Sequence, residues 1–164
     1  MNIDLRGVFS GRVECLPIDE KFDFSSVEIN GTTPISSPVS VVCTVAKKAD
    51  IVKIDGEASF VYTADCDRCA VETSREMKIP INHIIVNSVE NDDEEDFIVS
   101  ENMELDLEDL VRTDVSLGVP YLHLCKEDCK GVCAGCGKNL NKEDCVCKPQ
   151  VDERLSKLAE FFDD

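Results

Sequence analysis

The chain contains no tryptophan and has few aromatic, histidine or basic residues. Aromatic side chains make up 5% of the 164 residues, there are two histidines, and 17 Lys and Arg stand against 34 Asp and Glu, which gives a net charge of -17. Affinity for nucleic acid depends largely on a basic face that releases counterions from phosphates. The sequence shows no such face, which favours a basic protein partner over bare RNA or DNA.

Long apolar runs are also missing. No stretch approaches the roughly 18 consecutive apolar residues of a membrane-spanning helix. Asp4 and Arg6 interrupt the position where a signal peptide needs its apolar segment. We therefore expect a cytoplasmic protein that does not contact a membrane. Thiols stay reduced in that compartment, so clustered cysteines favour metal binding over disulfides.

Few residues are suited to catalysis. His83 lies in a strand-like segment, and neither His83 nor His123 is followed by the x-Glu of nucleobase deaminases. The sequence shows no phosphate-binding loop, no pairing of a nucleophile with a base and no closed set of catalytic carboxylates. It therefore predicts a protein that is not an enzyme.

The acidic residues are concentrated in one region. Residues 88–109 contain eleven acids and no Lys or Arg. The part from 88 to 96 is typical of a solvent-exposed loop, which either keeps the protein in solution or binds a basic partner. The candidate partner-binding residues are Glu90, Asp92, Asp93, Glu94, Glu95 and Asp96.

Cysteine, in contrast, is abundant. Six of the ten cysteines lie within the 23 positions from Cys125 to Cys147. Two cysteines a few residues apart supply half of a tetrahedral zinc site. The chain holds enough such half-sites for two zinc ions: Cys66 with Cys69, Cys125 with Cys129, Cys133 with Cys136, and Cys145 with Cys147.

Chain geometry favours one partition of these cysteines. A glycine, Gly137, follows Cys136 and permits a sharp turn there, and the eight residues before Cys145 are enough to return the chain to it. The remaining half-sites then form a site between segments about 60 positions apart. We call Cys66, Cys69, Cys125 and Cys129 the first cysteine group. We call Cys133, Cys136, Cys145 and Cys147 the second cysteine group. Other partitions stay open.

An iron–sulfur cluster is the main alternative to zinc. The segment from Cys129 to Cys136 has the cysteine spacing of radical SAM enzymes, but the chain is too short for their α/β barrel and shows no βα repeats. A cluster without a catalytic role stays open. A thioredoxin-like dithiol at Cys66 and Cys69 is disfavoured, because no helix follows the motif.

Three other residues are candidates for a ligand role or a place in the core. His123 stands two residues before Cys125 and stays open as a substitute ligand. Cys15 and Cys43 lie in strand-like surroundings, where we expect them to be buried as small hydrophobic residues.

Hydrophobic alternation predicts an α+β fold with an antiparallel β-meander. Residues 1–16 suggest an edge strand, and 39–64 and 71–86 alternate with period two. A short strand is expected at 97–99. Alternation alone leaves open whether the sheet closes into a barrel.

Two helices and a zinc-ribbon-like lobe complete the predicted architecture. Asp106 is suited to cap a helix over 106–117, and an apolar stripe predicts a C-terminal helix over 151–162 that packs on the domain. We expect a β-rich domain over 1–124 and a cysteine-rich lobe over 125–147.

Several of these segments resemble the YceD family of bacterial proteins. The resemblance rests on the Cys66-Asp-Arg-Cys69 turn after a long strand, on the acidic loop, on the helix that begins at Asp106, and on the segment from Leu124 to Asn141. It covers roughly residues 39–160. The family is linked to accumulation of the large-subunit (23S) ribosomal RNA, and the resemblance provides no catalytic residues.

The resemblance implies a role in synthesis, processing or stability of that RNA. Our main hypothesis is a non-catalytic, zinc-stabilised accessory protein in ribosome biogenesis that acts through basic ribosomal or rRNA-processing proteins. Direct contact with rRNA is left open. The alternative is an rRNA-processing enzyme, or an iron–sulfur or redox-active metal protein.

Overall fold

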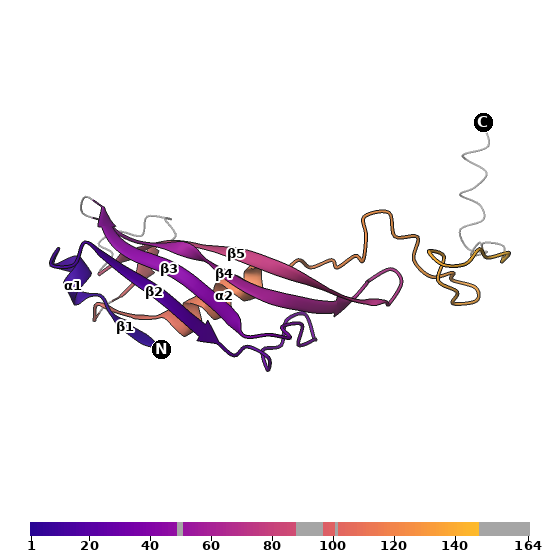
Figure 1. Ribbon diagram of the computed structural model, residues 1–164, viewed down its shortest axis with the longest axis horizontal. Coiled ribbons are helices and arrows are strands. Elements are labelled where there is room, and N and C mark those ends of the chain that lie inside the picture. The colour runs from indigo at the N-terminus through magenta and orange to yellow at the C-terminus, as the bar shows by residue number, and fades with distance from the viewer. Residues whose placement is uncertain (49–50, 88–96, 101, 148–164) are drawn as a thin grey trace, which may run out of the picture. The chain divides into compact units, whose positions relative to one another are not determined.

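The computed structural model describes residues 1–48, 51–87, 97–100 and 102–147 (Figure 1). The chain forms two compact units. The first contains Met1–Ala64 and Ser74–Tyr121, and the second contains Asp65–Thr73 and Leu122–Asp164. The turn that carries Cys66 and Cys69 therefore belongs to the same unit as the other clustered cysteines.

The first unit is built on a five-stranded sheet with the strand order β2-β3-β4-β5-β6. Its strands are β2 (Cys15–Phe22), β3 (Val39–Lys48), β4 (Ile51–Asp65), β5 (Glu72–Val86) and β6 (Phe97–Val99). The pairs β2–β3 and β3–β4 are antiparallel, whereas β6 runs parallel to β5. The predicted α+β class is confirmed, and the sheet is open and mixed rather than closed into a barrel.

Alternation of β-branched residues explains the central strands. Val39, Val41 and Val45 of β3 are fully buried, while Val42 between them is exposed. Val45 pairs with Ile54 of β4, which is also fully buried. Period-two burial of this kind places one face of the sheet on the core.

Helix α2 (Leu107–Gly118) lies over one face of the sheet (Figure 1). The Asp106 carboxylate accepts hydrogen bonds from the backbone N–H groups of Glu108 and Asp109, as a helix N-cap does. Leu107, Val111 and Val115 are buried in the same core as the strands. The helix predicted over 106–117 is therefore confirmed.

The prediction for residues 1–16 is wrong. β1 (Asn2–Asp4) pairs with β7 (Glu104–Asp106) in a separate two-stranded sheet, and α1 (Arg6–Phe9) follows it. Leu5 and Val8 are buried three residues apart, which fits a helical turn rather than a strand. β2 holds the edge of the large sheet instead. An edge strand tolerates Pro17, which lacks an N–H group.

The expectation for Cys43 is confirmed, but the one for Cys15 is wrong. Cys43 is 3% exposed in the core, whereas Cys15 is exposed. Cys15 opens the edge strand and pairs with Ala46, on the face opposite to Val45 and its buried neighbours. The prediction placed Cys15 at the end of a strand over 1–16, whereas Cys15 begins β2 and lies on the face of that strand away from the core.

Two predicted segments lie outside the described residues. They are the acidic loop over 88–96, with its six candidate partner-binding residues, and the C-terminal helix over 151–162. The structure therefore does not test either prediction. Within the described ranges, every helix is too short or too polar to cross a membrane.

Candidate metal centre

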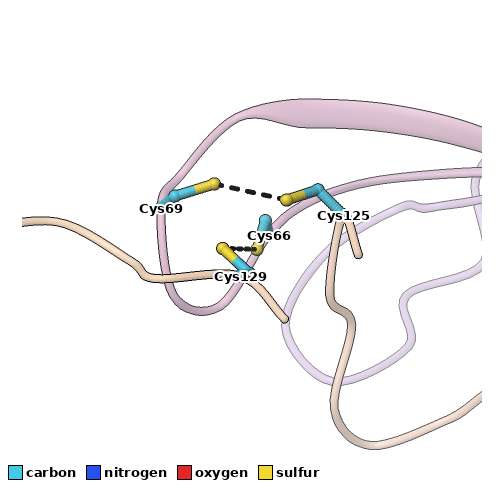
Figure 2. A group of neighbouring side chains, drawn as sticks. All are labelled: Cys66, Cys69, Cys125 and Cys129. Atoms are coloured by element: carbon cyan, nitrogen blue, oxygen red, sulfur yellow. Dashed lines mark hydrogen bonds between the residues drawn. The ribbon is translucent and has the colours of Figure 1, made fainter. Parts of the chain in front are cut away.

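The first cysteine group comes together from two distant segments (Figure 2). Cys66 and Cys69 lie in the turn between β4 and β5, and Cys125 and Cys129 follow α2 in the chain. The Sγ atoms of Cys66 and Cys129 are 3.8 Å apart, and those of Cys69 and Cys125 are 3.6 Å apart. Cys66, Cys69 and Cys129 are all at most 5% exposed. The group is therefore closed to solvent on most sides.

The second cysteine group is local in sequence and more open. The Sγ atom of Cys145 lies 3.4 Å from that of Cys136 and 3.3 Å from that of Cys133. Cys136 and Cys147 are exposed, and Cys133 and Cys145 are partly buried. In each group all four sulfur atoms lie within 4.8 Å of one another. The structure thus collects the eight cysteines in the partition that chain geometry favoured.

Both groups have a shape that fits a single tetrahedral metal ion. A zinc–thiolate bond of about 2.3 Å implies an edge of about 3.8 Å between sulfurs of a regular tetrahedron. The measured separations of 3.3 to 3.8 Å are close to this value. A disulfide needs about 2.05 Å, so these cysteines are free thiols. The donor set and its spacing therefore fit zinc.

The two Cys-x-x-Cys turns share one backbone geometry. The N–H of Gly137 donates to the carbonyl of Cys133 at 2.8 Å, and the N–H of Ala70 donates to the carbonyl of Cys66 at 2.8 Å. Gly137 has φ +72° and Ala70 has φ +51°. Left-handed backbone is unfavourable for residues with a Cβ. Ala70 is therefore the strained counterpart of Gly137.

Hydrogen bonds from backbone N–H groups are the main cause of the lowered pKa of Cys66 in the first group and of Cys133 in the second. The N–H of Cys125 is the main cause that lowers the pKa of Cys66 to about 6. The N–H of Cys136 is the main cause that lowers the pKa of Cys133 to about 6. Each group therefore presents a ready thiolate, the form of cysteine that binds metal.

Other thiols keep their protons more firmly. Burial raises the pKa of Cys125 to about 12, and the Cys145 thiol raises the pKa of Cys147 to about 12. For Cys125 the cost of a negative charge comes mainly from burial, and for Cys147 it comes mainly from the hydrogen-bonded Cys145 thiol. A bound cation would remove that cost.

Sequence reasoning missed residues that hold the first group in place. Arg68 donates from Nη1 to the carbonyl of Cys129 at 3.0 Å, and its own carbonyl accepts the N–H of Val132 at 3.0 Å. Asp67 accepts the backbone N–H of His123 at 2.6 Å. These contacts join the turn to the segment after α2. They depend on the folded path of the chain, so no spacing rule identifies them.

His123 does not take the ligand role that was left open. Its Nε2 atom lies 2.7 Å from the Thr73 hydroxyl, and the residue is buried. Among the described residues, the two groups with ligand atoms close enough for a metal contain only cysteine. His123 thus helps to fix the strand end rather than to complete a metal site.

The chain matches a known protein family and several known proteins. The family model described as "Large ribosomal RNA subunit accumulation protein YceD" matches residues 54–162. A protein of Arabidopsis thaliana named "Large ribosomal RNA subunit accumulation protein YCED homolog 1, chloroplastic" is 27% identical over 70% of this chain and 45% of its own length. A protein of Zea mays with the same name is 24% identical over 84% of this chain and 57% of its own length.

Bacterial relatives match as well. An uncharacterized protein of Mycobacterium tuberculosis is 26% identical over 68% of this chain and 56% of its own length. The chain thus spans about half the length of the curated relatives it matches. No solved structure matches it. The family match covers more than half of the chain and contains both cysteine groups, so the chain belongs to the YceD family of large ribosomal RNA subunit accumulation proteins.

Proposed function

We propose that this chain is a non-catalytic accessory factor that supports accumulation of the large-subunit ribosomal RNA, and that two zinc ions hold its cysteine-rich unit together. The family description supports the ribosomal role. The observation that supports the zinc is the assembly of eight cysteines into two four-sulfur groups. The ions would contribute folding free energy directly, because the ligands of the first group come from distant segments.

The close packing of the sulfurs favours one ion per group over an iron–sulfur cluster. A cluster places several iron and sulfide atoms between the cysteines that bind it, and so separates their sulfurs more widely. Here all four sulfurs of each group lie within 4.8 Å of one another. Zinc is the usual single ion with four thiolate ligands in structural sites.

The ligand set also favours a structural role over a catalytic one. Catalytic zinc sites keep one coordination position open for water or substrate, whereas structural sites use four protein ligands. Each group here offers four cysteines, which would leave no open position. The family description likewise names an accumulation role and no reaction.

The partner that best suits the charge is a basic ribosomal or rRNA-processing protein. The net charge is -17, and residues 88–109 carry eleven acids without a basic residue. Two ions bound by four thiolates each would leave both sites negative. Such a protein attracts a basic surface and is repelled by the phosphates of bare RNA.

Depletion in the native host, followed by gradient profiling of ribosomal particles, tests the ribosomal role. We expect fewer large subunits after depletion and recovery with the wild-type chain. Normal large-subunit levels after depletion would contradict the role.

The same strain tests the acidic loop. The variant replaces six acids by their amides: Glu90→Gln, Asp92→Asn, Asp93→Asn, Glu94→Gln, Glu95→Gln and Asp96→Asn. We expect it to keep its zinc, to capture less of the basic partner at low salt, and to restore large subunits poorly. Full recovery with unchanged partner capture would contradict a role of this loop.

A further inference from the structure

One side chain links the two cysteine groups. Asn141 lies between Cys136 and Cys145 of the second group, yet its Nδ2 atom donates to the Sγ of Cys129 in the first group at 3.3 Å. Cys129 is 3% exposed, so this contact is shielded from water. An N–H group that points at a buried thiolate stabilises the charge that a metal ion requires there.

The orientation of the Asn141 amide follows from its other contacts. Its Oδ1 atom accepts the backbone N–H of Lys130 at 3.0 Å. A backbone N–H can only donate, so the amide oxygen must face Lys130 and the NH₂ group must face Cys129. The backbone N–H of Asn141 donates to the Asn139 Oδ1 at 2.9 Å, and Nδ2 donates to the same oxygen at 3.1 Å. The side chain is therefore held from several directions.

The loop that carries Asn141 is built onto the second group. The N–H of Cys133 donates to the carbonyl of Lys138 at 2.8 Å, and the N–H of Leu140 donates to the carbonyl of Gly131 at 2.9 Å. Val132 and Asn139 form a β-bridge. A metal ion bound by Cys133, Cys136, Cys145 and Cys147 would close this loop at both ends. Assembly of the second group would therefore reinforce the position of the amide.

We propose that Asn141 couples the two metal sites: its amide donates to the Cys129 thiolate of the first site from a loop that the second site holds in place. This inference rests on the proposed zinc occupancy. Loading of the second site then strengthens the first, and by reciprocity loading of the first strengthens the second. Asn141 acts as a positioning residue, because it stabilises a ligand and is not one itself.

The size of the effect follows from other metal sites. Loss of a hydrogen bond to a metal ligand typically lowers metal affinity about 10- to 100-fold. Asn141→Asp keeps the shape and the oxygen that accepts from Lys130, but it replaces the NH₂ group with an anionic oxygen next to Cys129. We expect at least this loss at the first site.

Asn139→Asp is the matched control. Asn139 lies in the same loop and uses only its Oδ1 atom in the contacts with Asn141. An aspartate retains that oxygen and adds the same negative charge to the loop. We expect metal affinity at both sites to stay within about threefold of wild type, since the Asn139 Oδ1 atom faces the N–H donors of Asn141 rather than a cysteine sulfur.

Cadmium-113 NMR of the full chain, combined with chelator titration, tests the proposal. Each four-thiolate site should give its own resonance, and Cys136→Ser with Cys147→Ser identifies the second-site signal by its loss. For Asn141→Asp we expect the first-site resonance to shift and to disappear at about 10- to 100-fold less chelator. Resonances and affinities identical to wild type would overturn the proposal, as would equal weakening of both sites by Asn139→Asp.

The variant that lacks the second site, Cys136→Ser with Cys147→Ser, also tests the coupling. It gives a result even if Asn141→Asp does not fold. Cys136→Ser with Cys147→Ser should weaken cadmium at the first site, and adding Asn141→Asp should then change it less than in the wild-type background. An unchanged first site would overturn the coupling. Wild-type protein that binds no cadmium or zinc would instead contradict the proposed function, so the two failures are distinguishable.

Discussion

At the scale of single residues, the backbone conformation of the residue that follows each Cys-x-x-Cys turn affects the stability of that turn. Ala70 and Gly137 occupy equivalent places after the second cysteine of their turns, and both have positive φ. A Cβ added at Gly137 would meet no atom within 4 Å, so conformation alone decides the effect of a substitution there. The two turns therefore form a matched pair for measurement.

Ala70→Gly should stabilise the zinc-loaded protein, whereas Gly137→Ala should destabilise it. Left-handed backbone costs a residue with a Cβ about 1–2 kcal/mol, and glycine loses part of this advantage through about 0.5–1 kcal/mol of unfolded-state entropy. We expect changes of about 0.5–1 kcal/mol in opposite directions, measured by urea unfolding with zinc present. Changes of the same sign would contradict the shared geometry.

Zinc binding should release protons, because several thiols are protonated at neutral pH. The pKa is raised for Cys69 and Cys125 in the first group and for Cys145 and Cys147 in the second, so at least two protons per ion must leave. Thiolate ligands bound to zinc have depressed pKa values. The stability that zinc adds is therefore present at high pH and is lost as pH falls.

Calorimetry in buffers of different ionisation enthalpy measures this release. We expect at least two protons per zinc near pH 7.5 and an affinity that rises with pH. A pH-independent affinity would contradict ligation by these cysteines. Refolding in zinc-free buffer with a reductant serves as the control for disulfide formation.

Spacing in the sequence favours the same partition of cysteines that the structure shows. Cysteine is a dense and unambiguous signal, and chain length limits the partners within reach. Asn141 and Arg68 were not predictable in the same way. Asparagine and arginine occur throughout surfaces, and their contacts with Cys129 depend on the folded path of two segments. A metal ligand can be identified from its residue type and spacing. A residue that orients a ligand can be identified only when the fold is known.

At the scale of elements, long periodic segments were predictable and short ones were not. β3 and β4 carry enough alternating residues to fix their type, and α2 has both a cap and an apolar stripe. β1 and α1 have three and four residues, too few for either period to be distinguished. The parallel strand β6 likewise gives no local sign of its direction, because direction depends on the connection before it.

The N-cap of α2 should contribute measurably to the stability of the first unit. Asp106→Ala removes the acceptor for the N–H groups of Glu108 and Asp109 and should cost about 1 kcal/mol. Asp106→Asn keeps an acceptor oxygen and should cost only a few tenths of that. Urea unfolding followed by circular dichroism compares them. Equal losses in the two variants would show that charge, and not capping, is the cause.

At the scale of the whole molecule, we propose that the two units are stabilised in different ways. The first unit has an ordinary hydrophobic core of strands and α2. Among the described residues, the second unit buries a small cluster around Cys66, Cys69 and Cys129, and we propose that bound metal supplies the rest of its stability. Family membership connects this architecture to large-subunit rRNA accumulation, while the acidic character of the chain favours a protein as the direct contact.

Elemental analysis of protein purified under metal-replete, reducing conditions tests the central claim most directly. Each four-sulfur group is proposed to hold one ion, so we expect about two zinc ions per chain, no iron and no visible absorbance. Cys66→Ser with Cys129→Ser should remove one ion and leave the other. Less than one zinc per chain, or iron with the visible absorbance of a cluster, would contradict the account.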